Sequence, residues 1–139
     1  MVDKKFPWIG GIPDGLIKTP NEGEGILEIK CPYKGKDMKI SEMIANFKTF
    51  YLYYVKKGEI GLKKSNDYYY QVQGYMFITK TKWCDFVVWT KTDISISRIQ
   101  FDNKFFAEKM FPQLEHFYLK QKHKKRELLS KKETSTTCE

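Results

Sequence analysis

The sequence predicts an α/β (α+β) fold in which helices pack on a small mixed β-sheet. Strand-like and helix-like segments alternate along the chain, and its 139 residues, 41% hydrophobic and 16% aromatic, suffice for one domain with its own core. The apolar runs are short, and the four residues from Phe86 to Trp89 are typical. A membrane-spanning helix needs about 20 apolar residues, so we expect no membrane association.

The first part of the chain is predicted to be a β-hairpin. Residues 6–17 form two short extended pieces around a Gly-Gly pair and a Pro-Asp-Gly turn, because Gly, Pro and Asp disfavour helix. Residues 19–25 are a polar turn with one Pro and two Gly residues. Residues 26–31 (ILEIKC) then predict a strand, which Pro32 ends.

The middle of the chain predicts a helix, a strand and a second helix. Residues 40–47 carry apolar side chains at the spacing of one helix face, and residues 50–55 are aromatic and strand-prone. Residues 67–80 return to helical spacing despite their aromatic and β-branched content, and Asn66 or Asp67 is expected to cap this helix.

The last third predicts two strands and a helix. The continuous apolar run at 85–90 suits a strand buried on both faces, and residues 94–101 alternate as an outer strand of the same sheet. Residues 103–118 have helical spacing, and we expect Pro112 to kink or divide this helix. Apolar content then falls, which predicts a basic, mobile tail over 120–139.

Charge and cysteine content narrow the function classes. The chain carries 25 Lys and Arg against 17 Asp and Glu, a net charge of +8, which favours a polyanionic partner because Lys and Arg displace counterions from phosphates. Three cysteines without a Cys-x-x-Cys pair, together with two histidines, argue against a disulfide framework and a zinc site. We therefore expect an intracellular, reducing location.

The candidate chemistry lies in Asp14, Glu28 and Lys30. On a strand, Glu28 and Lys30 share a face with Cα atoms ~6.6 Å apart, and Asp14 ends an adjoining strand where its carboxylate can stand beside Glu28. Converging carboxylates repel unless a cation lies between them, and oxygen ligands favour Mg²⁺, with Mn²⁺ as a substitute. The set predicts a phosphodiester hydrolase in which Lys30 contacts the phosphate or lowers the pKa of the attacking water.

Spacing by itself leaves a second interpretation open. A Glu-x-Lys triplet is more often an exposed ion pair on a half-solvated strand than a catalytic site. The Pro-Asp-Gly turn upstream makes the exposed ion pair less favoured but does not exclude it. Gln71 and Tyr75 lie four residues apart, which places both side chains on one face of the predicted helix.

Four motifs in a fixed order decide between these interpretations. They are Pro13-Asp14-Gly15, LEIKCP at 27–32, YYYQVQGYM at 68–76 and WCDFVVW at 83–89. In this order the chain resembles, from about Trp8 to about Tyr118, the YqaJ-like viral recombinase family of the PD-(D/E)XK nuclease superfamily, which is similar to phage lambda exonuclease. The resemblance implies a restriction-endonuclease-like core in residues 1–119 and an exonuclease that acts on duplex DNA ends in recombination or repair.

The resemblance also implies roles for single residues. The metal ligands it implies are Asp14, Glu28 and the backbone carbonyl of Ile29. The catalytic residues it implies are Lys30, Gln71 and Tyr75, the last two forming a Gln-x-x-x-Tyr signature. The chain departs from the family in two places: Ile12 stands where a Ser or Thr is usual, and only twelve residues precede Pro13. We therefore expect the family's N-terminal helical part, with its acidic residue, to be missing.

The remaining expectations concern partners. Four lysines on predicted loops flank the site and are expected to contact the nucleic-acid backbone: Lys34, Lys36, Lys63 and Lys64. The aromatic residues at 50–54 and 68–70 are expected to pack in the fold rather than to stack on bases. A non-catalytic nucleic-acid-binding or assembly module is the main alternative function, and a site-specific endonuclease is a third. The sequence leaves a homo-oligomer open.

Overall fold

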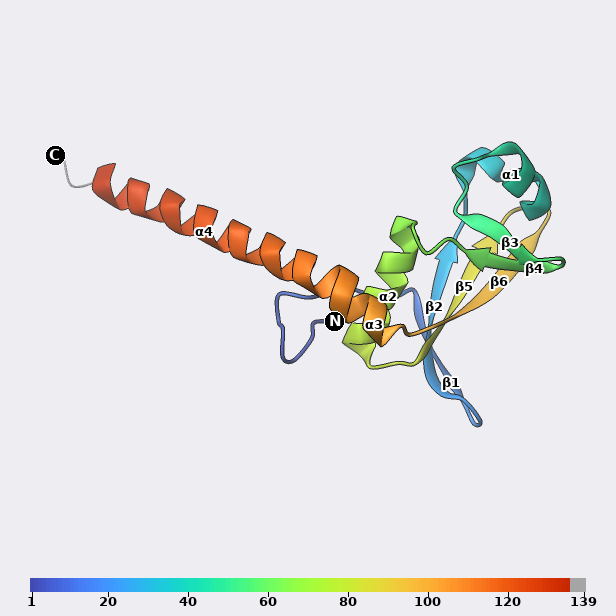
Figure 1. Cartoon of the computed structure of the whole chain (residues 1–139), viewed down its shortest axis with the longest axis horizontal. Helices are drawn as coiled ribbons and strands as arrows, with labels where there is room; N and C mark the ends of the chain where they lie inside the picture. Colours follow the sequence, from blue (N-terminus) through green and yellow to red (C-terminus); the bar gives the residue numbers. More distant parts are fainter. Residues whose placement is uncertain (136–139) are drawn as a thin grey trace. The chain divides into compact units, whose positions relative to one another are not determined.

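The computed structural model describes the backbone of residues 1–135 and the side chains of residues 1–129. The chain divides into two compact units, Met1–Asp102 and Asn103–Glu139 (Figure 1). The predicted division into a domain at 1–119 and a tail at 120–139 stays a prediction, and residues 136–139 lie outside the described part.

The first unit is built on a four-stranded mixed sheet with the strand order β1-β2-β5-β6. Its strands are β1 (Gly15–Thr19), β2 (Gly23–Lys30), β5 (Trp83–Trp89) and β6 (Ile94–Gln100). The pairs β1–β2 and β5–β6 are antiparallel, whereas β2 and β5 are parallel. The prediction of a small mixed sheet is confirmed.

The two faces of this sheet differ sharply in burial. Ile26, Phe86 and Val88 lie on one face and are completely buried, whereas Trp89 and Ile96 on the other face are 49% and 63% exposed. The helix α2 (Asp67–Thr79) contacts β2 and β5, and Figure 1 shows it alongside these strands. Because side chains alternate along a strand, every second residue of β2 faces α2.

A helix and a hairpin form part of the connection from β2 to α2. After a short 3₁₀ turn, η1 (Tyr33–Gly35), the chain forms α1 (Ile40–Asn46), then β3 (Leu52–Lys56) and β4 (Glu59–Leu62). The predicted helix at 40–47 and strand at 50–55 are confirmed, but β4 was not predicted. Gly58 turns the hairpin with a φ of +79°, and the Ser97 hydroxyl donates to the Ile60 carbonyl at 2.8 Å, which ties β4 to β6.

Helix α2 begins and ends with identifiable caps. Asn66, one of the two predicted caps, accepts a hydrogen bond from the Tyr68 amide at 3.0 Å. At the other end Lys80 adopts a left-handed conformation with a φ of 60°, and its amide donates to the Met76 carbonyl. This αL residue ends the helix as a glycine commonly does elsewhere.

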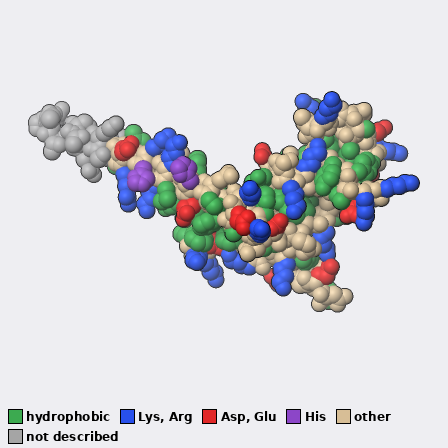
Figure 2. All heavy atoms as spheres, in the orientation of Figure 1, with side chains coloured by type: hydrophobic (Ala, Val, Ile, Leu, Met, Phe, Trp, Pro, Cys, Tyr) green, Lys and Arg blue, Asp and Glu red, His purple; other side chains and the backbone are tan. Residues whose placement is uncertain are grey.

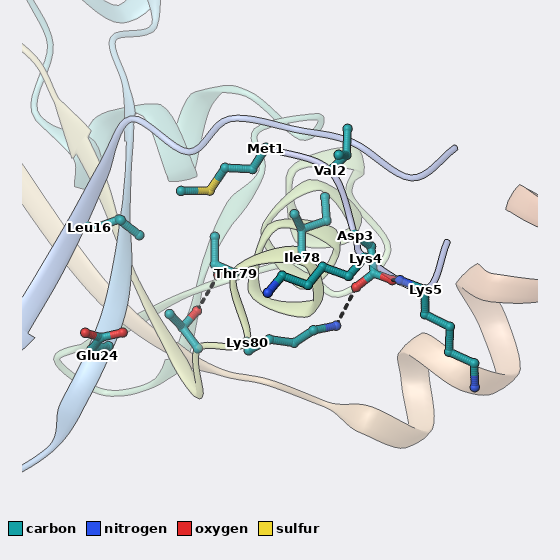
Figure 3. A pocket seen from close by; sticks show the side chains of 11 residues that line it. Met1, Val2, Asp3, Lys4, Lys5, Leu16, Glu24, Ile78, Thr79 and Lys80 are labelled. Atoms are coloured by element: carbon teal, nitrogen blue, oxygen red, sulfur yellow. Dashed lines mark hydrogen bonds and ion pairs between the residues drawn. The ribbon is translucent and has the colours of Figure 1, made fainter. Parts of the chain in front are cut away.

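The N-terminal segment folds back on itself and docks on the end of α2. Val2 pairs with Gly10, and the buried Asp3 carboxylate accepts hydrogen bonds from the Lys5 and Phe6 amides at 2.9 and 2.8 Å. The Lys80 ammonium reaches the same carboxylate at 2.5 Å (Figure 3). Of the two extended pieces predicted in 6–17, only the second is a strand.

The second unit is almost wholly helical. It consists of α3 (Asn103–Phe105), a π-helical turn η2 (Phe106–Met110) and α4 (Phe111–Ser135). The Phe111 amide donates to the Phe106 carbonyl, so the π turn lies directly before Pro112, which lacks an amide hydrogen and fits a helix start. The prediction that the helix ends at 118 was wrong, because the Lys-, Glu- and Leu-rich stretch beyond it favours helix.

Within residues 1–129, whose side chains are described, none of the helices is both long and apolar enough to cross a membrane.

The Asp3–Lys80 pair predicts an acid-sensitive contribution to stability. Lys80, with the backbone amides of Phe6 and Lys5, holds the pKa of Asp3 below its ordinary value of 3.8. A folded pKa below the unfolded one stabilises the fold above about pH 5, and this contribution is lost as the pH falls through the folded value. The urea midpoint of the parent should therefore fall more between about pH 5 and pH 2.5 than that of Asp3→Asn. An equal fall of the urea midpoint in the parent and in Asp3→Asn would contradict this.

Candidate active site

The site is built on the second half of β2, on the face toward α2. The side chains of Glu28 and Lys30 are only 4% and 18% exposed, and the Lys30 ammonium donates to Glu28 Oε1 at 2.6 Å. Glu28 Oε2 is buried and has no hydrogen-bond partner among the described residues. The exposed surface ion pair that the spacing also allowed is therefore not what the chain forms.

Helix α2 supplies the second half of the site. Gln71 Oε1 accepts a hydrogen bond from the Lys30 ammonium at 3.1 Å, and Gln71 Nε2 donates to the Tyr75 hydroxyl at 2.8 Å. Because the amide oxygen and nitrogen are both engaged, the Gln71 side chain has one orientation. The structure thus joins Glu28, Lys30, Gln71 and Tyr75 into one chain of hydrogen bonds.

Asp14 meets the same strand at its edge. The β1–β2 ladder ends at the pair Gly15–Leu27, and beyond it Asp14 Oδ2 accepts a hydrogen bond from the Ile29 amide at 2.8 Å. The amide and carbonyl of one strand residue point to the same edge, so the Ile29 carbonyl shares this edge with Asp14. The carboxylate of Asp14 therefore lies against the residue next to Glu28.

This donor set fits a hard divalent cation. Residues 1–129 contain no cluster of three or more His, Cys, Asp or Glu side chains that could hold a metal ion. Mg²⁺ needs less, since it is commonly bound by one or two carboxylates and keeps several waters. The unpartnered Glu28 Oε2 is a buried acceptor that a cation would satisfy.

The buried thiol of Cys84 is not a reactive group of this site. Cys84 lies on β5 beside the active-site strand, and burial, helped by the carboxylates of Glu28 and Asp85, raises its pKa to about 12. A thiol with this pKa stays protonated and is a weak nucleophile. The candidate ligands of a hard cation are the oxygens of Asp14, Glu28 and Ile29.

The four predicted DNA-contacting lysines lie in the segments that follow β2 and precede α2. Lys34 belongs to η1 and Lys36 follows it, shortly after β2 ends, while Lys63 and Lys64 lie between β4 and α2. Lys64 also pairs with Asp102 at 3.5 Å. Figure 2 shows Lys and Arg side chains at many separate points of the surface, with Asp and Glu between them. Contact of these lysines with nucleic acid stays a prediction.

A cavity of about 430 Å³ lies at the far end of α2 and is separate from the site. It is bounded by the N-terminal segment, by Leu16 and Glu24 of the β1–β2 hairpin, and by residues 78–81 (Figure 3). The Asp3–Lys80 ion pair lies in its wall. None of the predicted site residues lines this cavity, so it is not part of the candidate active site.

The part of the chain that holds the candidate active site matches a known protein family. Residues 1–82, which include all the candidate active-site residues, match the model of the YqaJ-like viral recombinase domain. The chain belongs to the YqaJ-like viral recombinase family. Among curated proteins, no sequence matches this YqaJ-like chain.

The YqaJ-like chain is similar to two solved structures of an alkaline exonuclease, LHK-Exo from Laribacter hongkongensis. The first has a TM-score of 0.52 and 23% identity, and the match covers 91% of the YqaJ-like chain and 63% of LHK-Exo. The second, LHK-Exo in complex with dAMP, has a TM-score of 0.53 and 24% identity, covering 88% and 62%. The YqaJ-like chain thus has the alkaline exonuclease fold, with its restriction-endonuclease-like core, and spans less than two thirds of LHK-Exo.

One contact of the YqaJ-like site was missed by sequence reasoning. The ring centroid of Tyr68 lies 4.4 Å from the Lys30 ammonium, although the sequence predicts only a packing role for this tyrosine. A signal was available, because Tyr68 precedes Gln71 by three residues and therefore shares its helix face.

The buried pair predicts a specific stability pattern. Lys30→Met leaves the Glu28 carboxylate without its partner and is expected to lower the free energy of unfolding by about 2 kcal/mol at neutral pH. The double variant Glu28→Gln/Lys30→Met should recover most of this loss in urea denaturation. Lys18→Met, which breaks an exposed pair with Glu24, is the matched control and should cause no measurable loss. An equal loss in the single and double variants would contradict the pairing.

Proposed function

We propose that the chain hydrolyses phosphodiester bonds of DNA with the help of a divalent cation, as an exonuclease on duplex ends in recombination or repair. One observation carries the proposal: the buried Glu28 Oε2 lacks a partner among the described residues, beside the edge where Asp14 meets Ile29. Membership of the YqaJ-like family and the alkaline exonuclease fold support it. An intracellular location, where DNA is recombined, belongs to the same proposal.

The cation would be held by Glu28, Asp14 and the Ile29 carbonyl, with Mg²⁺ as the preferred ion and Mn²⁺ as a substitute. When bound, such a cation makes water a better nucleophile and neutralises charge on the phosphate. The two carboxylates differ in exposure: Glu28 is buried, whereas Asp14 is exposed. The ion would therefore stabilise the buried Glu28 carboxylate most. Asp14 would be the ligand on the side of the ion that faces solvent.

Lys30 would stabilise negative charge on the reacting phosphate. Its ammonium is fixed by Glu28 and Gln71 before DNA arrives, so little reorganisation is needed when charge develops. Gln71 acts through Lys30, and Tyr75 acts through Gln71 by fixing its amide. Tyr75 is thus two hydrogen bonds removed from the ammonium.

Lys34, Lys36, Lys63 and Lys64 would contribute contacts to the DNA backbone. Such contacts carry no base information, which suits an enzyme that digests any sequence from an end. They also make binding dependent on salt concentration. A homo-oligomer, which the sequence leaves open, is compatible with this proposal.

The proposal predicts a cation-dependent digestion that either of two single substitutions abolishes. End-labelled linear duplex DNA should be digested with Mg²⁺ or Mn²⁺ but not with a chelator, and Glu28→Gln and Lys30→Ala should each slow single-turnover digestion by about 100-fold or more. Glu24→Gln, an exposed change on the same strand, is the matched control and should digest like the parent.

Two results would overturn this function. Digestion at the parental rate by either site variant would exclude the assigned residues. A parent that binds DNA in a salt-sensitive manner without any cation-dependent digestion would instead support the non-catalytic nucleic-acid-binding module. Covalently closed circular DNA separates the remaining modes, since an exonuclease leaves it intact and an endonuclease cuts it.

A further inference from the structure

Among the residues that the structure describes, three groups contact the Lys30 ammonium, and two of them are hydrogen-bond acceptors of the usual kind. Glu28 Oε1 lies at 2.6 Å and Gln71 Oε1 at 3.1 Å. The third is the ring of Tyr68, whose centroid is 4.4 Å from the nitrogen. A cation this close to an aromatic ring is attracted by the negative potential above its face.

The Tyr68 ring is itself held in place by other aromatic rings. Tyr51 meets it edge to face, with centroids 4.9 Å apart and planes at 81°, and Phe86 lies 6.0 Å away. Tyr51 also packs edge to face on Phe86 at 6.0 Å. Phe86 is completely buried in the core of the sheet, so the position of the Tyr68 ring is tied to the core.

The three partners of Lys30 differ in what a bound divalent cation would do to them. A cation bound to Glu28 would attract negative charge of the carboxylate that pairs with Lys30. The attraction between this carboxylate and the Lys30 ammonium would then be weaker. The Tyr68 ring and the Gln71 amide are neutral, and neither is a candidate ligand of the ion. The ring also attracts the ammonium without occupying one of its N–H groups in a conventional hydrogen bond, which leaves that donor available to a phosphate oxygen.

We propose that Tyr68 is a positioning residue whose ring face keeps the Lys30 ammonium aimed at the reacting phosphate while Glu28 is engaged by the cation. The inference rests on the proposed nuclease function and deepens it. It concerns the ring and not the hydroxyl, because the contact with Lys30 runs through the ring face.

The test compares Tyr68→Phe, which keeps the ring, with Tyr68→Leu, which removes it. Phe77→Leu is the matched control, because Phe77 lies on the same helix and makes the same kind of contact away from the site. Its ring centroid is 4.1 Å from the ammonium of another lysine, Lys80. Steady-state digestion of linear duplex DNA with Mg²⁺ gives kcat and, from KM, the apparent DNA affinity, and urea denaturation confirms that each variant is folded.

Tyr68→Leu is expected to lower kcat by about 10-fold with the apparent DNA affinity within about twofold of the parent, as loss of a partly desolvated cation–π contact implies. Tyr68→Phe and Phe77→Leu should keep the parental kcat. Without DNA or metal, the ε-methylene protons of Lys30 should show an upfield ring-current shift by NMR in the parent and Tyr68→Phe, and should lose it in Tyr68→Leu.

Two kinetic outcomes overturn the inference: a parental kcat in Tyr68→Leu, or an equal loss of kcat in Tyr68→Phe and Tyr68→Leu. The NMR measurement separates this failure from that of the proposed function. A parent that shows the ring-current shift and digests no DNA overturns the nuclease and the role of Tyr68 together. A parent that digests DNA without the shift overturns the role of Tyr68 alone.

Discussion

The burial of the Glu28 carboxylate is the constraint on which the rest of the site depends. A carboxylate removed from water costs several kcal/mol unless charge and hydrogen bonds compensate for it. Lys30 compensates one oxygen at 2.6 Å, while the other has no partner among the described residues. The proposed cation would satisfy this second oxygen.

The sheet topology produces this arrangement with few residues. Because side chains alternate along β2, Glu28 and Lys30 both face α2. The parallel strand β5 pairs with the edge of β2 that lies opposite Asp14. β1 begins at Gly15, so the edge of β2 beyond the Gly15–Leu27 pair is open to the Asp14 side chain instead of a further ladder bond. The start of one short strand therefore places the Asp14 carboxylate at the edge of β2 beside Ile29, the residue next to Glu28.

Sequence reasoning succeeded where one local rule decides and failed where long-range contacts decide. Strand parity correctly placed Glu28 and Lys30 together, and helical spacing correctly paired Gln71 with Tyr75. The strand β4 has only four residues with a glycine among them, so its sequence signal is weak. The docking of Asp3 on Lys80 depends on residues far apart in the chain, and spacing carries no information about it. Helical spacing places Tyr68 on the face of Gln71, but it does not identify Lys30 as the partner of the ring.

The most direct test of the central claim is anomalous diffraction from crystals of the protein soaked with Mn²⁺. The account predicts one strong peak about 2.0–2.2 Å from Glu28 Oε2, with Asp14 and the Ile29 carbonyl as its other protein ligands. A saturating soak that leaves Glu28 Oε2 without a peak, or that places Mn²⁺ only on other carboxylates, would contradict it.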